Sequence, residues 1–135
     1  NRILGVFAGA QYTATDGEVK FVKYFPTGTT TQASGDVTAY IYDDPNIVYA
    51  VQSAGSADFA DIGNNADIVA GSGDTLTGQS RFEISGTTGT GTANLRIHRK
   101  FDSPKNSYGT NGILEVTIHE HELNQHIDAD GTPGV

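Results

Sequence analysis

The chain has 135 residues, no cysteine and a formal net charge of −8 at pH 7, from 8 Lys and Arg against 16 Asp and Glu. This length allows a buried core without covalent cross-links, and the absence of cysteine excludes disulfides and thiolate metal sites. The acidic balance argues against nucleic acid, whose phosphates need a basic face, and no apolar run approaches the ~20 residues that cross a bilayer, so we expect neither nucleic acid nor membrane as a partner.

The first predicted element is a β-hairpin over residues 3–25. Ile3–Tyr12 is apolar on both faces, which predicts a strand, and Gly5 and Gly9 allow either a bulge or the close approach of another segment. An Asp-Gly pair at positions 16–17 follows, which tolerates the positive φ of a tight hairpin turn. Glu18–Phe25 then alternates, with Phe21 on the apolar side. Together these features predict two antiparallel strands.

A second hairpin is predicted around the acidic turn Asp43-Asp44-Pro45-Asn46. Val37–Tyr42 and Ile47–Gln52 flank this turn and are rich in aromatic and β-branched residues. Strand alternation places Tyr40 and Tyr42 on the face opposite the aliphatic side chains. Two interpretations stay open: the tyrosines form an interface, for which Tyr is well suited, or a second sheet of a sandwich covers them.

The connection from Ser53 to Gly78 is long and rich in Gly, Asn, Ser and Asp. Within it, Ser56–Gly63 predicts a short helix with Ser56 as the N-cap, and Asp67–Ala70 is at most a short strand. An irregular connection of this length inside one domain is usually functional or disordered.

The C-terminal half predicts further strands and a polar tail. Arg81–Ser85, Asn94–His98 and Ile113–His119 alternate, with aliphatic side chains inward. About seven short strands separated by turn residues predict an all-β protein with long loops, a β-sandwich or a barrel, in a single domain over residues 1–135. Glu120–Val135 is polar, so we expect an extended C-terminal arm at residues 120–135.

The strongest metal-binding pattern is His119-Glu120-His121, because alternate residues of a strand point the same way. His126 or Glu122 would have to supply a third ligand. The pattern faintly resembles a cupin motif, but the expected glutamate and the second motif are missing, and we expect solvent-facing histidines. Asp128–Gly131 begins like a calcium loop without its terminal glutamate. We therefore predict no catalytic, cofactor or metal site; a cupin-like metal enzyme is the less favoured alternative.

Four segments within Leu4–Gly78 resemble the capsid decoration (cement) proteins of tailed bacteriophages, of the kind encoded near the major capsid gene in marine and cyanobacterial podovirus-like phages. The segments are GVFAGAQY (5–12), EVKFVKYFPTGT (18–29), YIYDDPNIVYAVQ (40–52) and DIGNNADIVAGSG (61–73). The resemblance implies a β-rich protein made in the host cytoplasm and bound to the major capsid protein on the outer surface of the virion. It also implies a homo-oligomer, such as a trimer, around local symmetry axes.

We therefore expect a non-enzymatic structural protein of a phage virion that decorates and stabilises the capsid. The residues predicted to make the interface are Tyr40, Tyr42, Tyr49, Phe59, Arg96 and Arg99. The two arginines are also consistent with a solvated strand edge guarded by charge. The alternative function is an extracellular β-sandwich that binds carbohydrate or mediates adhesion, although the chain lacks tryptophan, the commonest residue for stacking on sugars.

Overall fold

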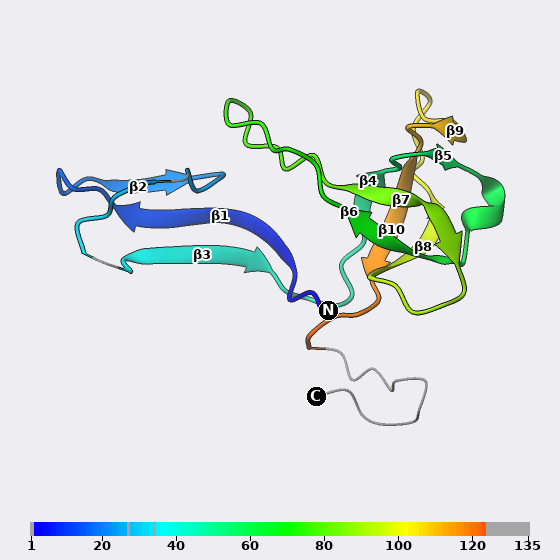
Figure 1. Cartoon of the computed structure of the whole chain (residues 1–135), viewed down its shortest axis with the longest axis horizontal. Helices are drawn as coiled ribbons and strands as arrows, with labels where there is room; N and C mark the ends of the chain where they lie inside the picture. The colour runs from blue at the N-terminus through cyan, green and yellow to red at the C-terminus, as the bar shows by residue number, and fades with distance from the viewer. Residues whose placement is uncertain (1, 27, 34, 124–135) are drawn as a thin grey trace.

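The computed structural model describes residues 2–26, 28–33 and 35–123. The protein is all-β, with 48% strand in antiparallel sheets of three and five strands that pack in a sandwich-like manner, without a closed barrel in the described part. The only helical turn among the described residues is the 3-10 turn η1 (Phe59–Asp61). The predicted all-β class is confirmed (Figure 1).

We call the three-stranded sheet the arm sheet, because it extends to one side of the molecule (Figure 1). Its strand order is β2-β1-β3. The strands are β1 (Val6–Thr13), β2 (Val19–Val22) and β3 (Val37–Tyr42). The predicted hairpin joins β1 to β2: Gly17 has a φ of 85°, and the side chain of Asp16 accepts a 3.0 Å hydrogen bond from the Glu18 N–H.

The predicted bulge lies near the start of β1. Phe7 pairs with Ile41 and Gly9 with Tyr40, so Ala8 is the extra residue on its strand. A bulge bends the strand that carries it and increases its local twist. The sheet therefore bends close to the point where the arm leaves the rest of the molecule.

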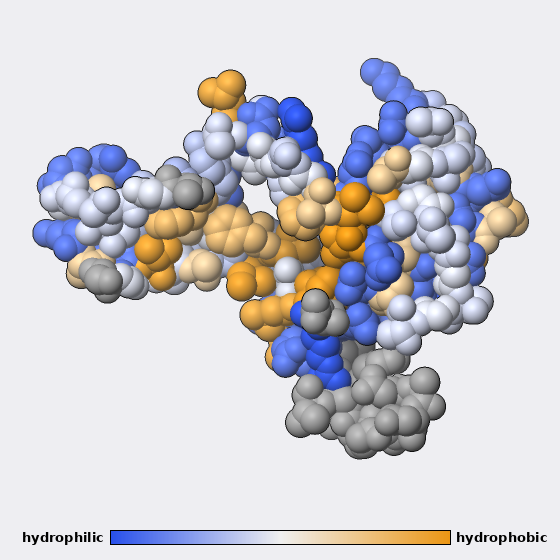
Figure 2. Space-filling model, viewed as in Figure 1, coloured by the Kyte–Doolittle hydropathy of each residue, from blue (hydrophilic) through white to orange (hydrophobic). Residues whose placement is uncertain are grey.

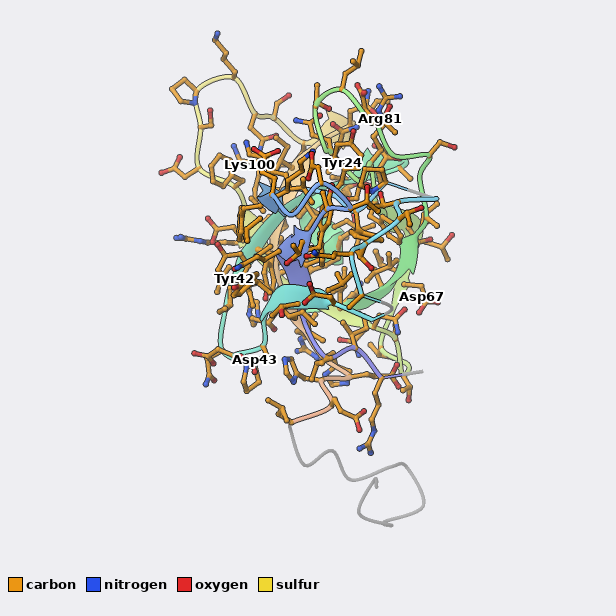
Figure 3. The ribbon with its side chains drawn as sticks, turned by 90° about the vertical axis from the view of Figure 1, so that its left-hand side faces the viewer. Tyr24, Tyr42, Asp43, Asp67, Arg81 and Lys100 are labelled. Atoms are coloured by element: carbon orange, nitrogen blue, oxygen red, sulfur yellow. The ribbon has the colours of Figure 1, made fainter. Side chains whose placement is uncertain are left out.

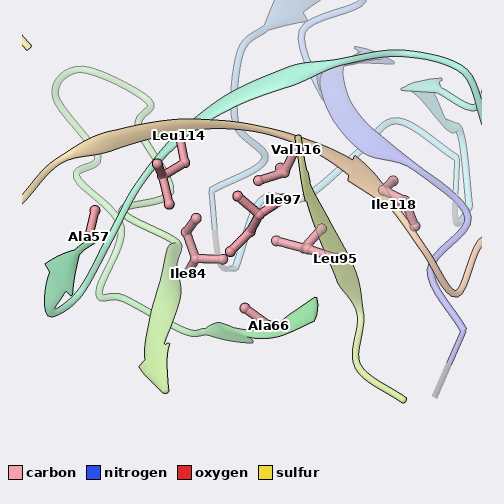
Figure 4. Close-up of a cluster of buried hydrophobic side chains, with 8 residues drawn as sticks. All are labelled: Ala57, Ala66, Ile84, Leu95, Ile97, Leu114, Val116 and Ile118. Carbon is pink, nitrogen blue, oxygen red and sulfur yellow. The ribbon is translucent and has the colours of Figure 1, made fainter. Parts of the chain in front are cut away.

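We call the five-stranded sheet, of order β4-β10-β8-β6-β7, the body sheet. Its strands are β4 (Tyr49–Gln52), β6 (Asn65–Val69), β7 (Glu83–Gly89), β8 (Leu95–Lys100) and β10 (Ile113–Ile118). A small sheet pairs β5 (Ser56–Ala57) with β9 (Gly109–Thr110). The core on one face of the body sheet comprises Ala57, Ala66, Ile84, Leu95, Ile97, Leu114, Val116 and Ile118 (Figure 4).

The inward-facing residues predicted for β8 and β10 are confirmed by this core. In β10, Leu114, Val116 and Ile118 are all buried, as strand alternation requires. For the predicted strand Arg81–Ser85, in which Phe82 and Ile84 were both expected to face inward, the prediction was half right: Ile84, within β7, is buried, whereas Phe82, just before β7, is exposed.

The predicted second hairpin is wrong. β3 pairs with β1, and β4 pairs with β10, so residues 43–46 connect the two sheets instead of two neighbouring strands. The predicted turn at residues 43–46 does form: within it, the Asp44 side chain accepts a 2.8 Å hydrogen bond from the Asn46 N–H. The physical reason is competition between partners: β1 offers β3 a long antiparallel ladder, while β10 places Tyr49 and Val51 against the core.

The helix predicted at Ser56–Gly63 is also wrong. Its first two residues form β5, and Asp58, not Ser56, caps the three-residue η1. Asp58 and Asp61 exchange hydrogen bonds in a capping box that satisfies the exposed N–H groups of this short turn. Downstream, Asn65–Val69 is an interior strand of the body sheet, so this connection is more ordered than its composition predicts.

Candidate binding surface on the arm sheet and the cleft at its base

One face of the arm sheet exposes large apolar and aromatic side chains. Phe21 is 65% exposed and Tyr42 57% exposed. The rings of Phe21 and Tyr40 contact each other with centroids 5.5 Å apart, and the Tyr40 hydroxyl donates a 2.9 Å hydrogen bond to Gln11 Oε1. These contacts hold the rings in place while leaving much of their surface in water. Val19, on the same face as Phe21, is exposed as well.

The opposite face of the arm sheet is only partly covered. Phe25 packs edge-on against Tyr12, with ring centroids 5.5 Å apart, and Tyr12 is buried. Phe7 and Ile41 of this face are nevertheless exposed. Every residue of β3 is exposed, so its aliphatic face does not join the core, and the interpretation in which a second sheet covers Tyr40 and Tyr42 is wrong. Contiguous exposed apolar patches are uncommon on monomeric proteins and often mark interaction sites.

A cleft of about 830 Å³ lies where the arm sheet meets the body sheet. Figure 2 shows apolar residues gathered in this hollow between the two parts of the molecule. The lining includes Val6, Phe7 and Tyr24 from the arm side and Tyr49, Val51, Ile68, Leu95, Val116 and Ile118 from the body sheet. Some core residues of the body sheet, Leu95, Val116 and Ile118, therefore also line the cleft. The cleft is thus a second apolar surface beside the arm sheet.

Tyr49 joins the cleft to the arm sheet. Its hydroxyl donates a 3.3 Å hydrogen bond to the carbonyl oxygen of Tyr42, the last residue of β3. Burial raises the pKa of the Tyr49 phenol above its ordinary value, and the negative charges of Asp44 and Asp43 raise it further. Figure 3, a view onto the arm side, shows Tyr42 and Asp43 on the same side of the molecule. The phenol therefore stays protonated and remains a hydrogen-bond donor at neutral pH.

A hairpin beside the cleft presents Leu76, which is 95% exposed. Asp74 organises this hairpin: its carboxylate accepts a 2.9 Å hydrogen bond from the Leu76 N–H, and its carbonyl accepts a 2.8 Å bond from the Gly78 N–H. Arg81 forms a 3.6 Å ion pair with the same carboxylate. The hydrogen bond from the Leu76 N–H, together with hydrogen bonds from Thr77 and the positive charge of Arg81, holds the pKa of the Asp74 carboxyl below its usual value. An apolar side chain is thus displayed on a loop with defined geometry.

The structure separates the predicted interface residues into groups. Tyr40, Tyr42 and Tyr49 lie on the arm sheet and at its base. Arg96 and Arg99 lie on the outer face of the body sheet, where Arg99 forms an ion pair with Glu115. Phe59 belongs to η1 and is exposed, with its ring edge-on to Tyr108. Phe59 and the arginines therefore do not belong to the surface formed by the tyrosines.

Solvent-facing histidines were expected after β10, and for His121 this expectation is wrong. His121 is 1% exposed; its Nδ1 accepts a 3.1 Å hydrogen bond from the Leu123 N–H, and its Nε2 has no partner among the described residues. The strand ends at Ile118, and His121 then forms a parallel bridge with Ile3. Strand alternation therefore cannot be extended from Ile118 to His121.

The metal pattern gains no support from the described residues. Within them, no group of three His, Cys, Asp or Glu side chains is placed to hold a metal ion. His126 and the possible calcium loop at residues 128–131 lie outside the described residues, as does most of the predicted arm at residues 120–135.

Sequence reasoning missed Phe7, Phe21 and Leu76 as surface residues. The alternation around Phe21 is the same for a core strand and for an exposed one, because the pattern distinguishes two faces without showing what covers them. Leu76 had a weak local signal: it stands alone between Asp74 and Gly78, in a turn-rich segment.

No family model, curated protein or solved structure matches this chain. Across the residues that the structure describes, no helix is both long and apolar enough to cross a membrane. The geometry of the arm sheet and the cleft therefore carries the functional argument.

Proposed function

We propose that this protein is a non-enzymatic structural component of a phage virion, which binds the major capsid protein on the outer capsid surface through the arm sheet and the adjoining cleft. In this role it decorates and stabilises the shell. The observation that carries the proposal is the arm sheet, whose two faces expose Phe7, Phe21, Tyr40, Ile41 and Tyr42. Aromatic side chains, tyrosine among them, are enriched in protein interfaces and among the residues that supply most of their binding energy.

The carboxylates that line the cleft are already bonded to other groups of the protein, which favours a binding role for the cleft over a catalytic one. Asp74 is bound to the backbone of its own hairpin and to Arg81. Glu83 accepts a 2.8 Å hydrogen bond from the side-chain amide of Gln52. Both carboxylates therefore stabilise the local structure, and the remaining lining of the cleft is mostly apolar.

The charge of the chain fits an assembly protein. A net charge of −8 keeps free copies apart in solution through mutual repulsion. The strands of the arm sheet contain one charged residue, Lys20, so this sheet can approach a partner at little electrostatic cost. A homo-oligomer around a local symmetry axis of the shell is part of the same proposal.

A carbohydrate-binding module is the second candidate. The observation in its favour is the pair of exposed rings of Phe21 and Tyr40, which lie side by side at a tilt of 44°. Exposed rings can stack on a sugar face. A glycan screen with the purified protein tests this alternative, and a hit lost in Phe21→Ser would favour it over capsid binding.

The proposed function is tested by co-sedimentation with virions and with shells that lack the protein. We expect the chain in purified virions, and we expect added protein to bind the depleted shells. Phe21→Ser should abolish most of this binding, whereas Phe59→Ser, which changes an even more exposed ring on η1, should leave it unchanged. Absence of the chain from virions would overturn the proposal, and the reverse behaviour of the two variants would move the interface to η1.

A further inference from the structure

The outer edge of β3 is an unprotected strand edge. At the other edge of the arm sheet, β2 carries Lys20, which forms a 3.5 Å ion pair with Glu18. Charged side chains, and lysine above all, are the usual means by which an edge strand avoids pairing with other chains. β3 has the sequence VTAYIY, without a charged residue or proline, and all six of its residues are exposed. This edge therefore has no such protection.

The backbone of β3 can accept another strand. Val37–Tyr42 pairs with β1 along one side, and no strand of the described residues pairs along the other. Because N–H and C=O groups point alternately to the two sides of a strand, about half of the residues of β3 direct them at the open side. An extended segment of about six residues can satisfy these groups, as in other cases of strand addition to a sheet edge.

Acidic residues flank β3 at both ends, and they favour binding of a segment that carries basic side chains at its own ends. Asp36 precedes the strand, and Asp43 and Asp44 follow it. The Asn46 backbone and side-chain N–H groups bond to the Asp44 carboxylate at 2.8 and 3.2 Å, which keeps this charge beside the end of the strand. The edge is thus neutral along its length and acidic at both ends.

We infer that the open edge of β3 binds an extended segment of the partner protein as a fourth strand, and that this segment is apolar and β-branched over about six residues with basic side chains at both ends. Opposite charges across a strand pair are favourable, so the basic ends would lie beside Asp36 and Asp43. That the segment belongs to the major capsid protein rests on the proposed function.

A second copy of this chain fits the edge poorly. Two β3 strands related by a two-fold axis would run antiparallel, which brings Asp36 of each copy towards Asp43 and Asp44 of the other. Like charges placed opposite each other destabilise a strand pair. The charge pattern therefore favours a different chain with the opposite charge.

Two synthetic peptides test the inference on the isolated protein. One has the sequence Lys-Lys-Val-Thr-Val-Thr-Val-Thr-Lys-Lys, and the other replaces each lysine with glutamate. Fluorescence anisotropy should show at least about tenfold tighter binding of the lysine peptide. Amide hydrogen exchange should slow at Val37–Tyr42 on binding. The double variant Asp36→Asn with Asp43→Asn should reduce the preference for lysine ends, whereas Asp67→Asn on the body sheet should leave it unchanged.

Equal affinity for the two peptides, or protection at a strand other than β3, would overturn the inference. A lysine peptide that binds at β3 together with a chain that does not bind virions would refute the proposed function and leave the edge assignment standing. Shell binding without slower amide exchange at Val37–Tyr42 would support the proposed function and refute the binding of a strand at the edge of β3. The failures of the two proposals are therefore distinguishable.

Discussion

The hydroxyl of Tyr49 donates a hydrogen bond to the carbonyl oxygen of Tyr42, and this bond links the first residue of β4 to the last residue of β3. Gly5, the residue just before β1, lies close to the same carbonyl oxygen. A Cβ atom added to Gly5 would lie 2.0 Å from that oxygen. The base of the arm sheet is therefore held at Tyr42 from two directions. This junction sets how the arm sheet borders the cleft.

Gly5→Ala should destabilise the protein by about 1–3 kcal/mol, because the added methyl group cannot fit beside the Tyr42 backbone without a shift of the strand. Urea denaturation measures the change. Gly91→Ala is the matched control, since a Cβ at that position meets nothing within 4 Å. Equal stability of the two variants would show that the junction at Tyr42 tolerates a side chain.

Tyr40→Ala should weaken binding to capsid shells by about 1–3 kcal/mol, because it removes a partly exposed aromatic anchor. The free energy of unfolding should fall by less than the about 3–5 kcal/mol typical of a core aromatic residue, because the ring is partly exposed and its main losses are the contact with Phe21 and the hydrogen bond to Gln11. A thermal melt and a shell-binding titration measure the two effects. A loss of about 3–5 kcal/mol in stability would identify Tyr40 as a core residue instead.

Two identical substitutions should differ sharply in their effect on stability. Leu114→Ala removes a side chain that is 2% exposed in the body core and should cost about 2–5 kcal/mol. Leu76→Ala changes a leucine at the hairpin tip and should stay within about 0.5 kcal/mol. Chemical denaturation of both variants gives the comparison, and similar losses would contradict the described burial.

The hairpin around Asp74 should loosen in acid. The backbone N–H groups of Leu76 and Thr77, together with Arg81, hold the pKa of Asp74 below its ordinary 3.8. Because the pKa is lower in the folded state, the carboxylate stabilises the hairpin above pH 3.8 and loses this effect as the pH falls through the folded-state pKa. An NMR titration should show the Leu76 amide shifting with a midpoint below 3.8.

Asp74→Asn should abolish that titration at Leu76, while Asp102→Asn, at an exposed position on another loop, should preserve it. A midpoint at or above 3.8 in the wild-type chain would mean that the carboxylate does not hold the hairpin.

The purified protein should retain no zinc, iron or manganese in stoichiometric amount. His121 is buried, and its Nδ1 accepts a hydrogen bond from the backbone, which places the proton of the neutral ring on Nε2 and leaves neither nitrogen ready to bind a metal. Metal analysis by mass spectrometry measures the content. A metal present at one ion per chain, and lost in His121→Ala, would restore the metal-enzyme interpretation.

Much of the body sheet was predictable from sequence. The alternation in Ile113–His119 and Asn94–His98 predicted the side chains that form the core, because successive residues of a strand point to opposite faces. The Asp16-Gly17 turn was predictable for an equally local reason, since few residue pairs accept its backbone geometry. These features depend on neighbours in the chain, which the sequence displays directly.

The candidate binding surface depended on contacts between distant segments. The sequence of β3 shows two different faces but does not show that β1 is its partner or that both faces stay exposed. The cleft exists because Tyr49 lies against the body core while its hydroxyl reaches Tyr42 on the arm sheet. His121 is buried because the chain turns after Ile118 and pairs with Ile3. Alternation is a local property, whereas strand pairing and the covering of a face are decided by competition among all segments of the folded chain.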